Sequence, residues 1–128
     1  MQITLQINAR WIITVDSDNN VLENHALIIQ HDKIIDILPQ QEANKYQAER
    51  CMELNDHALL PGFINAHTHA AMSLLKGLAD DLPLEEWLNE HIWPAEAALA
   101  NAEFVHDGST LAIAEMIRGG TTCFNDMY

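Results

Sequence analysis

Basic residues are scarce in this sequence: 6 lysines and arginines stand against 19 aspartates and glutamates, and the formal net charge is −13. Proteins bind nucleic acids and anionic lipid surfaces chiefly through clustered positive charge, so this balance argues against both as partners. No apolar run approaches the roughly 20 residues that span a bilayer, and the first ten residues lack the basic and apolar segments of an export signal. We therefore expect a cytoplasmic protein with no nucleic-acid and no membrane partner.

Cysteine, glycine and proline are also few, with 2, 5 and 4 residues respectively. Cys51 and Cys123 lie far apart and form no CxxC pair, which excludes a disulfide framework and a structural zinc knuckle. A hydrophobic content of 48% with 20% charged residues is that of a globular protein and not of a disordered or fibrous one. A length of 128 residues allows one modest core, either as a single domain or as a piece of a larger one.

Residues 1–57 have the pattern of short strands joined by turns. Apolar and polar residues alternate over residues 3–7, and apolar stretches follow at 11–15, 26–29 and 34–38. Asp16 to Asn20 carries side chains that bond their own backbone in turns, and His31 to Lys33 is short enough to close a hairpin. We predict a small antiparallel sheet here, followed by an irregular or loosely helical stretch over 39–52.

Residues 58–128 read as the beginning of a parallel α/β fold. The near-continuous apolar run over 58–67 predicts a parallel strand buried on both faces. A helix is expected over 84–92, with Pro94 breaking or kinking it. A second helix is expected over 102–118 and a further strand over 121–128. The sequence stops before such a sheet can close.

The second helix carries its own start and stop signals. Asn101 is a good N-cap and Gly119 with Gly120 a good C-cap. Small and apolar residues recur along one side of this helix at helical spacing, which permits a close approach to a sheet. They are Val105, Gly108, Ser109, Ala112, Ile113 and Met116.

His67 and His69 are the strongest candidates for chemistry. Alternate residues of a strand share a face, so the two imidazoles should converge on one point together with Phe63 and Asn65. Neutral imidazole is a good ligand for zinc and related divalent ions. The spacing alone is weak, because seven histidines in 128 residues produce a His-x-His by chance in roughly one such chain in three. The C-terminal end of an apolar strand is where α/β proteins place ligands, and this favours a metal site over two structural histidines.

The segment Leu60-Pro-Gly-Phe-Ile-Asn-Ala-His-Thr-His69 resembles the first barrel strand of the amidohydrolase superfamily. Residues 65–77, 80–88 and Trp93-Pro-Ala-Glu96 are similar to the 5-methylthioadenosine/S-adenosylhomocysteine deaminase family within it. The resemblance covers essentially the whole chain. It implies that residues 1–57 contribute to a β-sandwich, and that residues 58–128 form the first two β/α units of a (β/α)₈ TIM barrel that is incomplete in this chain.

The resemblance also implies roles for three residues and a reaction. His67 and His69 correspond to metal ligands, for one divalent ion with zinc preferred, and Glu96 corresponds to a glutamate that binds the substrate through its ribose hydroxyls. The family hydrolytically deaminates 5′-methylthioadenosine or S-adenosylhomocysteine to the inosine analogue and ammonia. Its other ligands and acid–base groups are expected beyond Tyr128, and the chain alone is expected to be inactive. Trp87 and Trp93 are assigned no role, because packing explains them equally well.

Two alternatives stay open from the sequence. A guanine, cytosine or triazine aminohydrolase shares the same metal strand, and Glu96 is the residue that separates it from a nucleoside deaminase. The other alternative is a non-catalytic fragment or assembly module, since two isolated β/α units would expose an open sheet edge and apolar faces. Such a chain is expected to associate or to be partly unfolded, and a homo-oligomer is compatible with either reading.

Overall fold

The computed structural model describes residues 1–127. The chain divides into two compact units, Met1–Pro61 and Gly62–Tyr128, each of which has its own fold. The boundary expected after residue 57 falls inside a strand that continues to Leu59. Among the described residues, no helix has the length and apolar character needed to cross a membrane.

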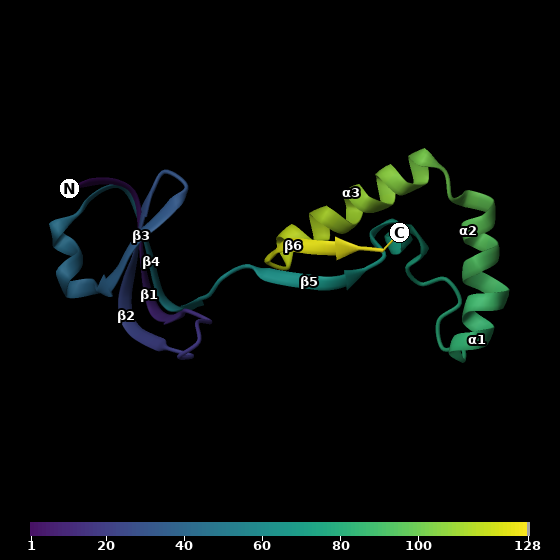
Figure 1. Ribbon diagram of the computed structural model, residues 1–128, viewed down its shortest axis with the longest axis horizontal. Coiled ribbons are helices and arrows are strands. Elements are labelled where there is room, and N and C mark those ends of the chain that lie inside the picture. The colour runs from purple at the N-terminus through teal and green to yellow at the C-terminus, as the bar shows by residue number, and fades with distance from the viewer. Residues whose placement is uncertain (128) are drawn as a thin grey trace. The chain divides into compact units, whose positions relative to one another are not determined.

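The first unit is built on a four-stranded mixed sheet (Figure 1). Its strands are β1 (Gln2–Ile13), β2 (Val21–Gln30), β3 (Lys33–Pro39) and β4 (Gln47–Leu59), in the spatial order β3-β2-β1-β4. The pairs β1–β2 and β2–β3 are antiparallel, but β1 and β4 are parallel. The prediction of a wholly antiparallel sheet is therefore wrong at β4.

The prediction of an irregular or loosely helical stretch over 39–52 is also wrong in part. The short 3₁₀ helix η1 covers only Gln40–Lys45, and β4 begins at Gln47. The strand was hard to recognise because it is rich in polar residues and lies at the sheet edge. Its apolar positions do alternate, since Ala48, Met52 and Leu54 are half-buried while Glu49, Cys51 and Glu53 are exposed.

Both predicted turns of this unit are confirmed. The Asp16 carboxylate accepts hydrogen bonds from the backbone N–H groups of Asp18 and Asn20, at 3.1 and 3.4 Å. Hydrogen bonds, first from the Thr14 side chain and then from Asn20, lower the pKa of Asp16 below its usual value. At the hairpin, Gln30 pairs with Lys33, and His31 adopts a φ of 55° in the two-residue turn. These side chains and backbone angles are the ones that close short turns.

The core of the first unit lies on both faces of the sheet. Residues on one face form a cluster of Ile3, Ala26, Ile28, Leu38 and Ala43, and the other face carries Ala9, Ile12 and Leu27. The alternation of Ala26, Leu27 and Ile28 along β2 sends neighbouring side chains to opposite sides. Each face therefore needs its own apolar side chains, which explains why consecutive residues of β2 are hydrophobic.

The second unit is a strand–helices–strand arrangement. Strands β5 (Phe63–Thr68) and β6 (Thr121–Asp126) pair in parallel, and the chain between them forms η2 (Ala70–Leu75), α1 (Leu84–Glu86), η3 (Trp87–Ile92), α2 (Trp93–Leu99) and α3 (Ala102–Arg118). In Figure 1, α3 runs alongside the two strands, and α1 to α2 form one continuous coil. The predicted second helix and second strand are confirmed.

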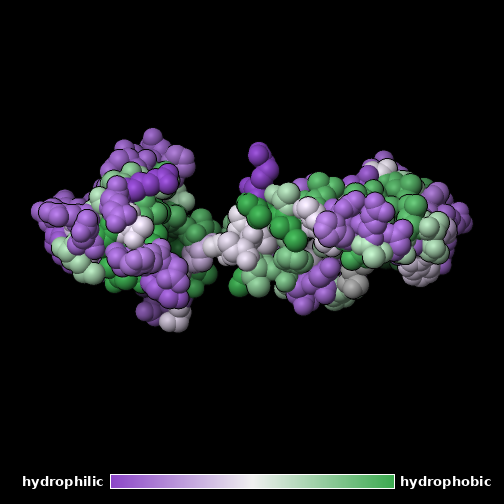
Figure 2. Space-filling model, turned by 90° about the horizontal axis from the view of Figure 1, so that it is seen from above, coloured by the Kyte–Doolittle hydropathy of each residue, from purple (hydrophilic) through white to green (hydrophobic). Residues whose placement is uncertain are grey.

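The apolar run over 58–67 is not one buried strand. Residues 60–62 separate β4 from β5, and on β5 the side chains of Phe63 and Ile64 are 55% and 75% exposed. A parallel strand is buried when neighbouring strands and helices cover both of its faces, and among the described residues β5 has one partner strand, β6. Figure 2 shows hydrophobic as well as hydrophilic surface on each unit, and Ile117 and Met127 are further large apolar side chains left exposed.

Of the two outcomes expected at Pro94, a break or a kink, the break is not found. The coil runs from Leu84 to Leu99, and Trp87–Ile92 is wound as a π helix just before the proline. A proline within a helix lacks a backbone N–H and crowds the carbonyl four residues earlier. The wider π turn moves that carbonyl away and accommodates the ring without a break.

The caps of α3 and the burial of its small residues are as the sequence predicts. The difference is that these residues contact η2 and not the sheet alone. The Asn101 side chain accepts a hydrogen bond from the Phe104 N–H at 2.9 Å, and Gly120 closes the other end with a φ of 82°. Gly108 and Ala112 are buried. A Cβ atom placed on Gly108 would lie 2.8 Å from the Ala71 Cα, so this face of α3 packs against η2 as well as the sheet.

Candidate metal and substrate site

The histidine pair lies where β5 ends. His67 belongs to the strand, while His69 is the residue that precedes η2, with φ −121° and ψ 76°. The Asn65 side chain accepts a hydrogen bond from the His67 N–H at 3.3 Å. The two histidines are therefore not placed by a regular strand alone, as the sequence suggested, but by a strand end with its own side-chain hydrogen bonds.

The two imidazole rings converge as expected. Their Nε2 atoms lie 3.2 Å apart, the ring centroids are 5.1 Å apart, and the rings are inclined at 62°. Two ligand nitrogens at about 2.0–2.1 Å from a tetrahedral zinc ion would be about 3.3–3.4 Å apart. The Nε2 separation matches this value, so the pair fits a shared divalent cation. Both side chains are exposed, which leaves room for further ligands.

The pair cannot complete a metal site by itself. Catalytic zinc sites use three protein ligands and keep one position open. Within residues 1–127, no group of three histidine, cysteine, aspartate or glutamate side chains is placed to hold a metal ion. His67 and His69 can thus supply two ligands of such a set.

Glu96, the predicted substrate ligand, shares a cavity with His69. This cavity has a volume of about 230 Å³, and it is lined by His69, Met72, Trp87, Leu88, Ile92, Trp93 and Glu96.

 The side chain of Glu96 is half-buried on α2, so its carboxylate lies beside apolar walls and not on an open helix face. The structure therefore brings together two of the three residues that the sequence singled out, and His67 adjoins them through His69.

Trp87 and Trp93 are wall residues of the same cavity, to which the sequence analysis assigned no role. The Trp87 indole N–H donates to the Leu78 carbonyl at 3.1 Å, which fixes the plane of its ring. Trp93 remains 52% exposed and offers much of its surface to a ligand. Helical spacing could have found Trp93, because it lies three positions before Glu96 and so shares its side of α2.

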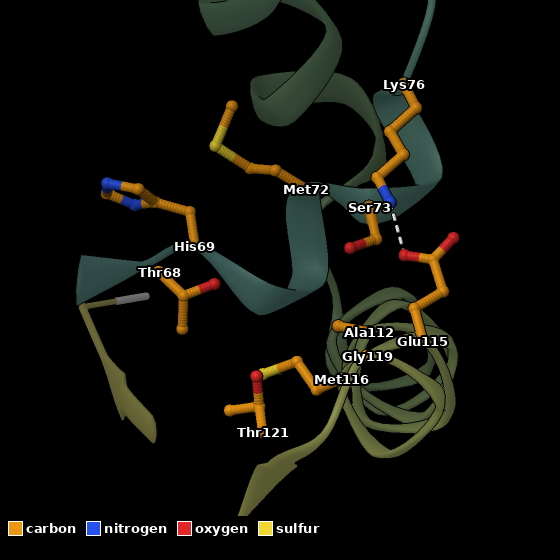
Figure 3. A pocket seen from close by; sticks show the side chains of 10 residues that line it. All are labelled: Thr68, His69, Met72, Ser73, Lys76, Ala112, Glu115, Met116, Gly119 and Thr121. Atoms are coloured by element: carbon orange, nitrogen blue, oxygen red, sulfur yellow. Dashed lines mark hydrogen bonds and ion pairs between the residues drawn. The ribbon is translucent and has the colours of Figure 1, made fainter. Parts of the chain in front are cut away.

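A second cavity, which His69 and Met72 also line, has a volume of about 530 Å³ (Figure 3). Lys76 and Glu115 form an ion pair at its edge. The ring of His69 points away from that ion pair in Figure 3, and neither His67 nor Glu96 lines this cavity. The larger cavity is therefore not the one in which the candidate residues meet.

The remaining five histidines lie apart from the pair. His25 contacts the Glu23 carbonyl through Nδ1 at 2.7 Å, and His106 contacts the Asp107 carboxylate at 2.9 Å. His31 and His57 are exposed, and His91 is half-buried. His106 is the most useful comparison for the candidate pair because it is exposed and belongs to the same unit.

The chain is similar in sequence and fold to known proteins. Residues 58–128 match the family model described as the amidohydrolase family. This match spans more than half of the chain, and the chain belongs to that family. The expected fold class, part of an amidohydrolase fold, is confirmed, while closure of the strands into a barrel stays a prediction.

Individual relatives match nearly the whole chain. It is 47% identical over 128 residues to a 5-methylthioadenosine/S-adenosylhomocysteine deaminase of Thermodesulfovibrio yellowstonii, covering 98% of this chain and 29% of the relative. A 5′-deoxyadenosine deaminase of Methanosarcina acetivorans is 47% identical over 122 residues, covering 95% and 27%. The crystal structure of an adenosine deaminase from Xanthomonas campestris with bound zinc superposes with a TM-score of 0.92 and 48% identity, covering 99% and 29%. The chain thus spans less than a third of the length of these relatives.

Proposed function

We propose that this chain forms part of the active site of a metal-dependent deaminase that hydrolyses 5′-methylthioadenosine or S-adenosylhomocysteine to the inosine analogue and ammonia. The observation that carries the proposal is that His69, paired with His67 at 3.2 Å, lines the same cavity as Glu96. The names of the deaminase relatives support the reaction and the adenine nucleoside class. The activity belongs to the complete protein, because the chain spans less than a third of those relatives.

His67 and His69 would hold one divalent ion, for which zinc is the best candidate. Their ring nitrogens have the separation that a tetrahedral ion requires, and the zinc-bound relative supports the choice of metal. When bound, such an ion acts as a Lewis acid and makes water a strong nucleophile at neutral pH. The contribution of this chain is to hold two ligands at one edge of the substrate cavity.

Glu96 would bind the ribose of the substrate. An ionised carboxylate only accepts hydrogen bonds and can take two hydroxyl donors at once, as a ribose diol offers. A substrate without the diol would leave this half-buried carboxylate without partners, and that costs binding free energy. Glu96 thereby favours ribonucleosides over free bases.

The apolar walls suit the rest of the substrate. Trp87, Trp93 and Met72 line the cavity with aromatic rings and a thioether sulfur. Aromatic faces bind flat bases by stacking, and methionine packs well against sulfur-containing and aromatic groups. We infer that these walls contact the adenine or the 5′ thioether. Adenosine lacks the thioether, so a contact with this group would favour the thioether nucleosides over adenosine.

The overall reaction is a hydrolysis at C6 of the adenine. A bond forms between C6 and the oxygen of water, the bond between C6 and the amino nitrogen breaks, and the nitrogen leaves with protons as ammonia. Within this chain, Glu96 orients the ribose and the tryptophans exclude water from the bound base. The groups that move protons during the reaction lie outside the residues described.

The test uses the protein expressed from its complete coding sequence. We expect zinc in the purified protein and release of ammonia from 5′-methylthioadenosine and S-adenosylhomocysteine, with less from adenosine and none from guanine, cytosine or a triazine. His67→Ala and His69→Ala should each lose metal and turnover together, whereas His106→Ala should keep both. Turnover of a free base would favour another aminohydrolase, and a metal-free protein without any turnover would favour an assembly module.

A further inference from the structure

The segment that carries both histidines is held by side chains of the neighbouring strand. Asp126, at the end of β6, accepts a hydrogen bond from the Ala70 N–H through Oδ1 at 2.9 Å. Asn125 donates to the Ala66 carbonyl through its side-chain amide at 3.4 Å. The Met127 N–H adds a backbone bond to the Thr68 carbonyl at 3.1 Å. These contacts bracket His67 and His69 on both sides.

The strand pairing is irregular at this place. Asn65 pairs with Phe124 and Thr68 with Asp126, so that Ala66 and His67 on β5 stand opposite Asn125 alone on β6. One extra residue on one strand is a β-bulge, which re-aims the side chains next to it. A bulge lacks part of the ladder of backbone hydrogen bonds, so other groups must fix the conformation that makes the rings converge.

We propose that Asp126 is a positioning residue for the metal site and acts through the Ala70 N–H on His69. Ala70 begins η2, and the residue before it, His69, makes no side-chain cap of that helix. The Asp126 carboxylate takes the place of the cap from the other strand. Its charge makes the hydrogen bond stronger than a neutral one, and it orients the backbone from which the His69 ring projects.

Burial explains why this one bond matters. Ala70 and Ala71 are both 0% exposed, so the Ala70 N–H has no access to bulk water as a replacement partner. A buried N–H without an acceptor is costly, and the turn would relax to find one. Because His69 is the residue directly before Ala70, such a relaxation would move its ring away from the 3.2 Å contact with His67.

A different role for Asp126 makes a different prediction. A carboxylate that bound the metal directly would lose its function on conversion to an amide. A carboxylate that positions His69 only has to accept a hydrogen bond, which the Asn side-chain oxygen also does. Asp126→Asn therefore separates the two roles, and Asp126→Leu fills the same space with no acceptor.

The inference rests on the proposed metal site, and its test is carried out on the protein from the complete coding sequence. Zinc affinity is measured by competition with a chelator, and the visible spectrum of the cobalt-substituted protein reports the ligand geometry. We expect Asp126→Ala and Asp126→Leu to bind zinc about 10–100-fold more weakly with an altered cobalt spectrum, and Asp126→Asn to stay within about threefold of the unmodified protein. Asp107→Ala, which removes an exposed carboxylate of the same unit, should change neither.

The outcomes are distinguishable. If the unmodified protein binds no zinc, the proposed function fails at its metal site. If it binds zinc but Asp126→Leu binds equally well, only the positioning role is overturned. Equal loss in Asp126→Asn and Asp126→Leu would make Asp126 a ligand instead. A merely structural residue would lower the melting temperature of the metal-free protein and leave the zinc affinity and the cobalt spectrum unchanged.

Discussion

Glu96 and His69 line one cavity although they belong to different elements, α2 and the end of β5. The π-helical turn over Trp87–Ile92 precedes α2 and sets the rotation at which Glu96 leaves the coil. A π turn adds about one residue per turn relative to an α helix, and it therefore changes which side chains of the following helix face the cavity. The residues proposed to bind the substrate and the metal thus face one cavity across a coil that has a local irregularity just before Pro94.

Replacing Glu96 with Gln should weaken the use of ribonucleosides selectively. The amide loses the charge and keeps one acceptor, and a hydrogen bond to a charged group contributes about 1.5–3 kcal/mol. We expect kcat/KM for 5′-methylthioadenosine to fall roughly 10–100-fold. An analogue without the 2′ and 3′ hydroxyls should be affected much less. The measurement is steady-state ammonia release with both compounds.

Glu103→Gln is the matched control for Glu96, because Glu103 is an exposed glutamate in the first turn of α3. It should leave both rates unchanged. Equal losses for the nucleoside and its dideoxy analogue in Glu96→Gln would contradict a ribose contact. That result would favour an aminohydrolase that acts on free bases.

The sequence predicts the histidine pair and its neighbours better than it predicts the strand that carries them. His67 and His69 converge because alternate positions of an extended chain share a side, and that argument needs no tertiary structure. The bulge and the contacts from Asn125 and Asp126 come from pairing between segments far apart in the chain. No local pattern indicates them.

In the fold, too, local features are predicted from the sequence while long-range pairing is not. The helix cap at Asn101 and the turn at Asp16 are predicted correctly because their side chains bond to residues within a few positions, and the hairpin at His31 because its turn is set by the backbone of two residues. The parallel pairing of β4 with β1 is missed, since it depends on which edge of the sheet is free. Burial of β5 is mispredicted for a related reason: apolar composition reports what a strand can bury, while exposure depends on its neighbours.

Gly108→Ala should destabilise the second unit. An added Cβ would lie 2.8 Å from the Ala71 Cα, and the atoms it meets are backbone, which cannot rotate away. Overpacking of this kind costs about 1–3 kcal/mol, despite the better helix propensity of alanine. Because η2 follows His69 directly, the shift should also weaken metal binding. Thermal melts and zinc titration of the protein measure the two effects.

Gly119→Ala provides the comparison for Gly108. A Cβ there would meet only the Glu115 carbonyl oxygen at 3.5 Å and the Met116 carbonyl oxygen at 3.6 Å, which are ordinary contacts, and Gly119 has a φ of −82°. We expect a change in unfolding free energy within about 0.5 kcal/mol. If Gly108→Ala proves as harmless as Gly119→Ala, the close packing of α3 on η2 is not a constraint on the fold.

Tyr46→Phe should remove a pH-dependent part of the stability of the first unit. The Tyr46 hydroxyl donates to the Asp36 carboxylate at 2.8 Å, and Lys45 lies 3.3 Å from the same oxygen. The hydrogen bond from Tyr46, followed by the contribution of Lys45, lowers the pKa of Asp36 below its ordinary value of 3.8. The same hydrogen bond to Asp36 raises the pKa of Tyr46 above its ordinary value of 10.0.

The signs of these two shifts define the pH window of the effect. A carboxyl with a lowered pKa in the folded state adds stability above its unfolded pKa and loses it as the pH falls through the folded value. A phenol with a raised pKa adds stability below its unfolded pKa and loses it as the pH rises through the folded value. The melting temperature of Tyr46→Phe should therefore lie below that of the unmodified protein between about pH 4 and 10, and the two should converge below about pH 4. Thermal melts at a series of pH values measure the stability difference, and an NMR titration of the Asp36 carboxyl carbon measures its pKa. Lys45→Met should give a smaller change in melting temperature in the same direction. Melting curves of Tyr46→Phe and the unmodified protein that stay parallel at all pH values would show that Tyr46 acts through packing alone.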